Sequence, residues 1–206
     1  MSATVGPRLL VTDYTALRAA SETLRVLLKD HITDSADADI GGVQIDLRSP
    51  YQLEKANVTT AVSLWLFRVA LQPDMLNLPL PRRSEDEYAH RPLPLELSYL
   101  VTALHPEAKK HLALTGHVLQ IVNDHGRLRG ASLMDTLAGS DAELRLSIDA
   151  TTMIESSDLW YSLQSPFRLA VPVKVQVASI ESHLPTMTAP PVLTRPGRTV
   201  EIVGAP

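Results

Sequence analysis

The sequence predicts an α+β fold, in which a single mixed, mostly antiparallel sheet of about five strands is packed by two to three helices. Some segments repeat apolar residues at helical spacing, and others alternate apolar and polar residues at every second position. Three strand-like segments also follow one another with no helix between them, which favours antiparallel connections. The chain has 206 residues, 45% of them hydrophobic, which is enough for one domain with a substantial core.

The first predicted element is a helix over residues 13–32. Leucines and alanines recur there at helical spacing, and charged residues occupy the opposite side. Thr12 or Asp13 can cap its start, because the oxygens of their side chains accept hydrogen bonds from backbone N–H groups. The polar residues 34–42 that follow are expected to form a loop.

Three strands are predicted next. Residues 43–47 alternate strictly between apolar and polar side chains, as a half-buried strand does. Residues 59–71 carry apolar side chains on both faces, which predicts a central strand covered on both sides. Residues 93–103 place their leucine, tyrosine and valine side chains on one face and polar side chains on the other, which predicts burial of one face only.

A second helix is predicted to open at Pro106, where the missing amide donor costs nothing. Gly126 can end this helix in a left-handed conformation. Residues three or four positions apart are expected to form its inner stripe, namely Ala108, Leu112, Thr115, Leu119 and Val122.

The last third of the domain is predicted to hold a strand, a short helix and a final strand. Residues 144–148 alternate between apolar and polar side chains. Thr152 and Glu155 have the spacing of a capping box ahead of a short helix. Residues 169–177 carry apolar side chains at every second position. Pro172 indicates an edge position or a bulge in this strand, because proline cannot donate to the ladder.

Ten of the fifteen prolines gather in two stretches, 73–94 and 185–206. Proline fixes φ and lacks an N–H group, so these stretches are poor material for helices or central strands. Residues 73–92 are therefore predicted to form a long surface loop. The predicted organisation is one α+β domain over residues 1–183, followed by a proline-rich extended tail over residues 184–206.

The composition excludes several classes of protein. A net charge of −4 argues against a general binder of nucleic acid, which needs a concentrated basic face. A chain without cysteine has no disulfide, no thiolate nucleophile and no cysteine-ligated metal. No signal-like segment opens the sequence, and no run approaches the ~18–20 apolar residues of a membrane span. We therefore expect a cytoplasmic protein with no nucleic acid and no membrane among its partners.

The residues that could carry chemistry form no recognised site. The seven histidines lack the spacing of a zinc motif; His111 and His117, six residues apart, fall on opposite sides of a helix. Ser140 lacks a Gly-x-Ser-x-Gly context and is expected in a polar turn. The pair Gly41-Gly42 lacks the lysine of a phosphate-binding loop and is also expected to form a turn. No catalytic, cofactor-binding or metal-binding residue is predicted, and the chain is expected not to be an enzyme.

Four segments together form a recognisable set. Residues 64–69, which read LWLFRV, are followed by Leu76-Asn77, and residues 91–103 read RPLPLELSYLVTA. Residues 116–124 read GHVLQIVND, and residues 159–169 contain Leu-Trp and then Ser-Pro-Phe-Arg-Leu. In this order they resemble the cap, or tube-terminator, proteins of extracellular contractile injection systems of the virulence-cassette and antifeeding-prophage type.

The resemblance covers roughly residues 8–180 and implies a tail-terminator-like fold with a structural role. The chain departs from the family in the final strand, where Ala170 and Val173 stand in place of a serine and a tyrosine. The resemblance implies a homo-hexameric ring on the distal end of the inner tube, which contacts the tube protein and the sheath protein and stops the growth of both. It also implies assembly in the cytoplasm, followed by a place in an injection particle that lysis can release.

Such a ring needs a head-to-tail contact and a second face for tube or sheath. The 73–92 loop and the 184–206 tail are the predicted contact segments, because long loops are often binding elements. An extended tail can also add a strand to a neighbouring sheet, and residues 199–203 alternate suitably. The residues predicted in these contacts are Arg82, Arg83, Glu85, Asp86, Tyr88, Arg91, Val192, Leu193, Val200 and Ile202.

Two other functions stay open from the sequence. A neck or terminator protein of a contractile phage tail would rely on the same physics in a different particle. A small ligand-binding or enzymatic domain without a recognisable motif would instead have a concave pocket with convergent polar groups.

Overall fold

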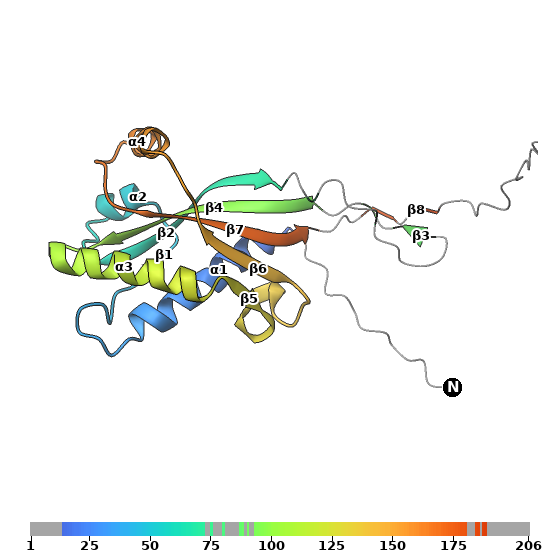
Figure 1. Cartoon of the computed structure of the whole chain (residues 1–206), viewed down its shortest axis with the longest axis horizontal. Helices are drawn as coiled ribbons and strands as arrows, with labels where there is room; N and C mark the ends of the chain where they lie inside the picture. The colour runs from blue at the N-terminus through green and yellow to red at the C-terminus, as the bar shows by residue number, and fades with distance from the viewer. Residues whose placement is uncertain are drawn as a thin grey trace, which may run out of the picture.

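A six-stranded sheet forms the centre of the molecule (Figure 1). The computed structural model describes residues 14–72 and 93–180, together with residues 75, 80, 87, 88, 90, 184, 185, 187 and 188. The order of strands in the sheet is β1-β2-β4-β7-β6-β5. In chain order these strands are β1 (Ile45–Asp46), β2 (Ala61–Leu71), β4 (Leu93–Leu104), β5 (Arg127–Arg129), β6 (Glu143–Ile148) and β7 (Val171–Ile180).

The pairing of the strands confirms the predicted α+β class. Strands β1 and β2 run parallel, and each of the other pairs in the six-stranded sheet is antiparallel. The sheet has one strand more than expected, because β5 is too short to produce a recognisable alternation. A separate antiparallel pair joins β3 (Glu87–Tyr88) to β8 (Met187–Thr188).

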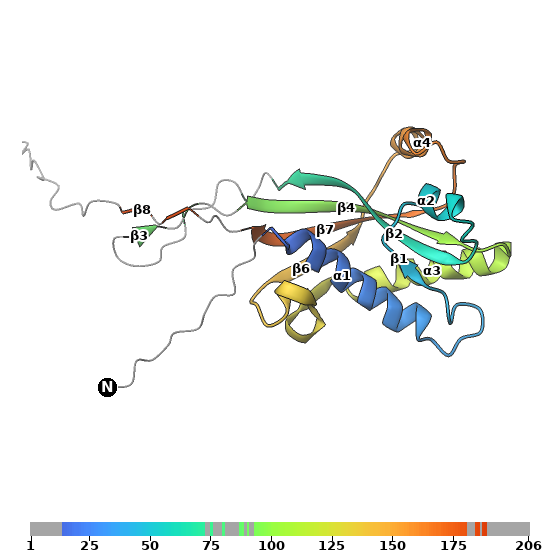
Figure 2. The same cartoon turned by 180° about the vertical axis from the view of Figure 1, so that it is seen from behind.

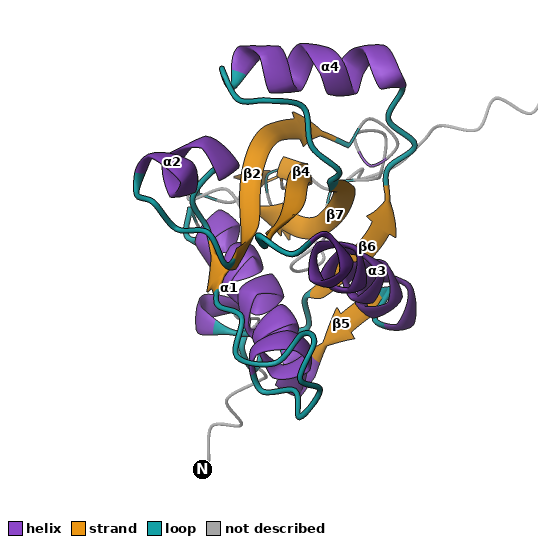
Figure 3. Ribbon diagram, turned by 90° about the vertical axis from the view of Figure 1, so that its left-hand side faces the viewer, coloured by secondary structure: helices purple, strands orange, loops and turns teal. Residues whose placement is uncertain are grey.

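Within the described residues, four α-helices pack around the sheet, namely α1 (Ala16–Leu28), α2 (Pro50–Lys55), α3 (Ala108–Asp124) and α4 (Met153–Ser162). Figure 3 shows α1 and α3 on one side of the sheet, α4 on the opposite side, and α2 beside β2. Helix α1 confirms the first predicted helix, and a π-helical turn over Lys29–Thr33 continues it. In the part of the chain that the structure describes, no helix has the length and apolar character needed to cross a bilayer.

The main core lies between the sheet and the helices α1 and α3, and its largest fully buried side chain is Tyr99 from β4. The hydroxyl of Tyr99 lies 2.8 Å from the Oγ atom of Ser21 in α1, so the phenol is satisfied within apolar surroundings. Burial raises the pKa of Tyr99 to about 12, and the hydrogen bond with Ser21 opposes this shift.

Strand β4 is buried on both faces, so the prediction that only one of its faces is buried was wrong. Ser98 and Thr102 on the second face are as inaccessible as the core residues. Helix α2, which the sequence pattern did not predict, packs Leu53 against Ala61 and Leu104 on this side. A helix of six residues is too short to show a helical period, so the second layer over the sheet leaves no signal in the sequence.

Helix α3 buries a stripe that is rotated from the predicted one. Of the five predicted residues, Thr115 and Val122 are buried, whereas Ala108, Leu112 and Leu119 are exposed. The buried stripe is completed by Leu114, Val118 and Ile121. Because apolar residues surround much of this helix, its sequence allows more than one inward stripe, and only packing on the sheet selects between them.

The ends of two helices also differ from the prediction. The N-cap of α1 is Thr15, so the expected cap at Thr12 or Asp13 was wrong; these two positions lie outside the described residues. Helix α3 begins at Ala108 with Glu107 as its N-cap, so Pro106 lies before the helix and does not open it as predicted. The Glu107 amide donates to Nδ1 of His105 at 3.0 Å. Gly126 has no left-handed φ, because its carbonyl accepts the N–H of Leu146 at 2.9 Å and so extends the pairing with β6.

The final strand lies in the middle of the sheet. Strand β7 pairs with both β4 and β6, so Pro172 does not mark an edge, contrary to the prediction. Pro172 is the second residue of β7, beyond the last paired residue of β6, and its carbonyl accepts the Asp149 N–H at 2.9 Å. Proline is tolerated there because no ladder donor is required at the start of a strand.

The strands β2, β4 and β7 continue past α3 as an arm, and α1 begins beside this end of the sheet (Figures 1 and 2). Residues 61–64 of β2 are buried, but Val69 and Leu71 farther along the strand are 49% and 47% exposed. The prediction that this strand is covered on both sides therefore holds only for its first part.

Tyr99→Phe is expected to lower the free energy of unfolding by about 1 kcal/mol, because Ser21 keeps its hydrogen bond to the Leu17 carbonyl. The folded-state pKa of Tyr99 lies above the ordinary value of about 10. The stability that depends on its proton is therefore complete below about pH 10 and is lost as the pH rises through about 12.

Denaturant unfolding at neutral and at strongly alkaline pH measures both effects. Tyr161→Phe is the matched control, because Tyr161 is exposed and should change neither. If both variants lost the same free energy of unfolding, the stabilising role assigned to the Tyr99 hydroxyl would be contradicted.

Candidate assembly surfaces

The predicted contact residues fall mostly beyond the described part of the chain. Tyr88 is described and lies in β3, opposite Met187 of β8. The two segments that the sequence marked separately, the 73–92 loop and the tail from residue 184, are therefore joined by backbone pairing. The other predicted residues lie outside the described residues, namely Arg82, Arg83, Glu85, Asp86, Arg91, Val192, Leu193, Val200 and Ile202.

Helix α4 presents large apolar side chains that no other described residue buries. The predicted capping box at its start is confirmed: Thr152 Oγ1 accepts the Glu155 N–H, and the Glu155 carboxylate accepts the Thr152 N–H at 2.9 Å. These hydrogen bonds hold the pKa of Glu155 below its ordinary value. Met153, Ile154 and Tyr161 are each more than 70% exposed, and Met153 lies at the cleft between α4 and the sheet. Exposed apolar groups gathered on one element are typical of a contact surface.

The segment after α4 fastens the helix to the rest of the fold. Ser165 Oγ donates to Oε2 of Glu54 in α2 at 3.0 Å, and Arg168 forms an ion pair with the same carboxylate. The buried ring of Trp160 lies 6.3 Å from that of Phe167. Helix α4 therefore has a defined position, although it stands apart from the sheet.

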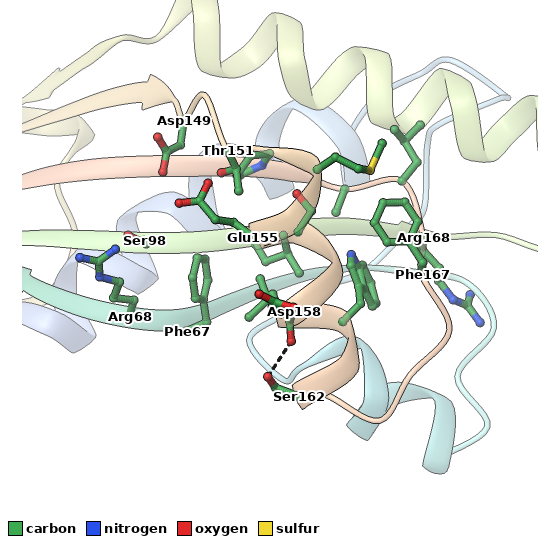
Figure 4. Close-up of a pocket in the computed structure, with 18 of the residues that line it drawn as sticks. Phe67, Arg68, Ser98, Asp149, Thr151, Glu155, Asp158, Ser162, Phe167 and Arg168 are labelled. Carbon is green, nitrogen blue, oxygen red and sulfur yellow. Dashed lines mark hydrogen bonds between the residues drawn. The ribbon is translucent and has the colours of Figure 1, made fainter.

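A cleft of about 690 Å³ opens between α4 and the sheet (Figure 4). On its floor Lys174 Nζ lies 3.1 Å from Asp149 Oδ1 and 3.8 Å from Glu96 Oε1. The hydrogen bond with Asp149 raises the pKa of Lys174. Figure 4 shows Arg68 and Glu155 at the same cleft. Lys174 and Glu155 are thus already held by hydrogen bonds to partners within the chain.

A second apolar hollow runs between α3 and the ends of the strands. The exposed residues Leu112 and Leu119 of α3 line it together with Ile148 and Leu169, around a volume of about 270 Å³. Leu169 and Pro172 also line the cleft below α4, so the two hollows adjoin. Leu112 and Leu119, which the sequence placed in the core, thus belong to an outward surface.

The histidines, Ser140 and Gly42, which the sequence analysis considered as possible site residues, make contacts or turns within the fold. The rings of His31 and His125 lie 4.6 Å apart, and His117 Nε2 lies 3.0 Å from the His31 carbonyl oxygen. Within the described ranges, no three histidine or carboxylate side chains are grouped as ligands of a metal. Ser140 donates to a backbone carbonyl at 2.7 Å and Gly42 has a φ of 78° in a turn, as predicted for both positions.

A domain that leaves apolar surfaces on several separate elements belongs to the class of proteins that associate with other chains. Over residues 19–194 the sequence matches the Pvc16 N-terminal domain family, and the chain belongs to this family. The family resemblance described above is thereby confirmed. No curated protein matches the sequence.

Two solved structures share the fold. One is the PVC sheath/tube terminator of an extracellular contractile injection system in its extended state, with a TM-score of 0.59 and 13% identity over 91% of this chain and 65% of that chain. The other is the tube-terminating cap of the anti-feeding prophage, with a TM-score of 0.51 and 14% identity over 85% of this chain and 59% of that chain. This chain therefore spans less than two thirds of either relative. The likeness confirms the expected terminator-like fold.

Thr152→Ala is expected to destabilise α4 locally by about 1 kcal/mol, because the N-cap hydroxyl satisfies an otherwise unpaired amide. The protection of the amides of residues 153–162 against hydrogen exchange should fall about fivefold. Ser157→Ala is the matched control, since this hydroxyl bonds only to the Met153 carbonyl within the helix. An equal loss of protection in both variants would show that the cap does not hold α4.

Proposed function

We propose that this protein is a structural cap subunit, which forms a ring on the distal end of the tube of a phage-tail-like contractile injection system. The observation that carries this proposal is the match of 91% of the chain to the fold of a sheath/tube terminator. Membership of the Pvc16 N-terminal domain family supports it independently. The role is non-enzymatic, because it consists of binding the tube and sheath and ending their growth.

The partners of such a subunit are further copies of itself, the inner tube protein and the sheath protein. A homo-hexameric ring closes through a heterologous contact, so each subunit needs two complementary surfaces for its neighbours. A further surface must fit the last layer of tube or sheath. The apolar residues of α4, the hollow beside α3 and the arm lie on different elements and can serve these separate contacts.

The proposed organisation is an α+β cap domain over residues 1–183 and a contact tail over residues 184–206. The pairing of β3 with β8 supports a joint role for the loop and the tail, because it binds the two segments into one unit. The subunit assembles in the cytoplasm and then becomes part of the particle. No nucleic acid and no membrane takes part in this role.

A strain that lacks this protein is expected to make tubes and sheaths of uncontrolled length, or sheaths that come apart, because nothing ends their growth. Electron microscopy of purified particles measures the distribution of lengths. Complementation with the wild-type chain should restore a single length. Particles of normal length in the deletion strain would overturn the proposed function.

Deleting residues 184–206, or replacing both Arg82 and Arg83 by Glu, is expected to leave the fold intact and to weaken assembly. Circular dichroism and thermal unfolding check the fold, and capped particles are counted by electron microscopy. The matched control replaces Lys109 and Lys110 by Glu, which changes the net charge equally at the end of α3 that is distant from the arm (Figure 1). Normal capping by the deletion and arginine variants would remove these segments from the contact.

A further inference from the structure

One edge of β2 lacks a neighbouring strand over most of its length. Strand β1 pairs with β2 only at Val62 and Ser63, while β4 follows the other side of β2 from Ala61 to Leu71. Within the part of the chain that the structure describes, nothing pairs with the outer edge of residues 64–71. Figures 1 and 2 show this edge along the outside of the arm. The N–H and C=O groups of such an edge are a template for an added strand.

The two faces beside this edge differ in chemistry. A β-bulge lies between Leu66 and Arg68 and changes the alternation. Beyond the bulge, Val69 and Leu71 are half exposed on the face that continues the core, and Arg68 is exposed on the face of the cleft. A bulge and a charge on an edge strand prevent unspecific pairing. The edge therefore favours a strand that has apolar residues at alternate positions and an acidic residue between them.

Residues 199–203 have this pattern. In an extended strand, Val200 and Ile202 share one face and Glu201 lies between them on the other. When the two apolar side chains lie beside Val69, Glu201 comes to the same side as Arg68, where opposite charges in adjacent strands attract.

The chain is long enough for this segment to reach another subunit. The connection from Thr188, the last residue of β8, to Thr199 can span about 36 Å when extended. The donor segment and the β2 edge are different surfaces of the same chain. Pairing between copies is therefore head-to-tail, which is the geometry that closes a ring.

We propose that residues 199–203 of one subunit add as a strand to the β2 edge at residues 68–71 of the adjacent subunit. This inference rests on the proposed ring and assigns its closing contact. Donation in one direction around the ring covers the exposed edge of every subunit and gives every tail one acceptor.

Cysteine pairs test the pairing directly, because the natural chain contains no cysteine. Full-length Val69→Cys chains are mixed with full-length Val200→Cys chains or with Ile202→Cys chains, oxidised mildly and separated without reductant. A disulfide-linked dimer of unlike chains is expected with Val200→Cys if the added strand is antiparallel, and with Ile202→Cys if it is parallel. In a chain that carries both cysteines, the same disulfide should link successive subunits. The products should then form a series from dimers upward that stops at the size of the closed ring.

Two controls define the outcome that overturns the proposal. Thr199→Cys lies on the other face of the donor strand, so it should give no comparable dimer when mixed with Val69→Cys. Arg127→Cys lies on the opposite edge of the sheet, in β5, so it should give no comparable dimer when mixed with Val200→Cys or Ile202→Cys. The proposal is overturned if neither donor variant links to Val69→Cys in trans. It is also overturned if the doubly substituted chain links only within itself, because the tail then covers its own edge.

A charge exchange provides a second measurement. Arg68→Glu should weaken ring formation about fivefold, since two carboxylates would then face each other across the strands. Adding Glu201→Arg to the same chain should restore it. If cross-linking fails while the deletion strain still makes tubes of uncontrolled length, only the strand assignment is wrong. If that strain makes normal particles, the proposed function is wrong as well.

Discussion

Strand β4 is buried on both faces from Leu97 to Leu104, and the other elements of the fold are placed against it. On one face Tyr99 bonds to Ser21 and packs within the main core beneath α1 and α3. On the other face Leu104 packs against Leu53 of α2. Strands β2 and β7 pair along nearly the whole length of β4, so the central strand links both layers. Burial of apolar area is the main favourable term in folding. Because both apolar layers pack against β4, the fold depends on this strand.

The same three strands explain why so much apolar surface stays uncovered. They extend beyond α3 as the arm, where Leu95 of β4 stays buried but the end of β2 does not. Val69 and Leu71 are exposed for this reason, although their residue types suit a core. Helix α4 stands on the opposite side of the sheet and is attached mainly through the segment that carries Ser165 and Arg168. A monomer gains nothing from these surfaces, whereas a subunit of an assembly can bury them.

Charge has different roles on the two kinds of surface. Ion pairs such as that between Arg18 and Asp135 are exposed to solvent, so they contribute little to stability. In the cleft Lys174 of β7 lies 3.1 Å from the carboxylate of Asp149, which follows β6, and 3.8 Å from that of Glu96 in β4, so it lies between charges on both neighbouring strands. At the β2 edge Arg68 is exposed next to the exposed Val69, and a charge on an edge strand disfavours pairing with most other strands.

The sequence by itself determined the longer helices and strands, but not the short elements α2 and β5, because only a longer segment repeats its apolar side chains often enough to show a period of 3.6 or of two residues. It also determined the Thr152 capping box, the turns at Gly42 and Ser140, and the family, since each depends on neighbouring residues or on order along the chain. Only the tertiary structure decided that Leu112 faces outward and that β7 is central despite Pro172. It also brought the loop and the tail together in β3 and β8. These features depend on what packs against an element from far along the chain, and a local period carries no information about that partner.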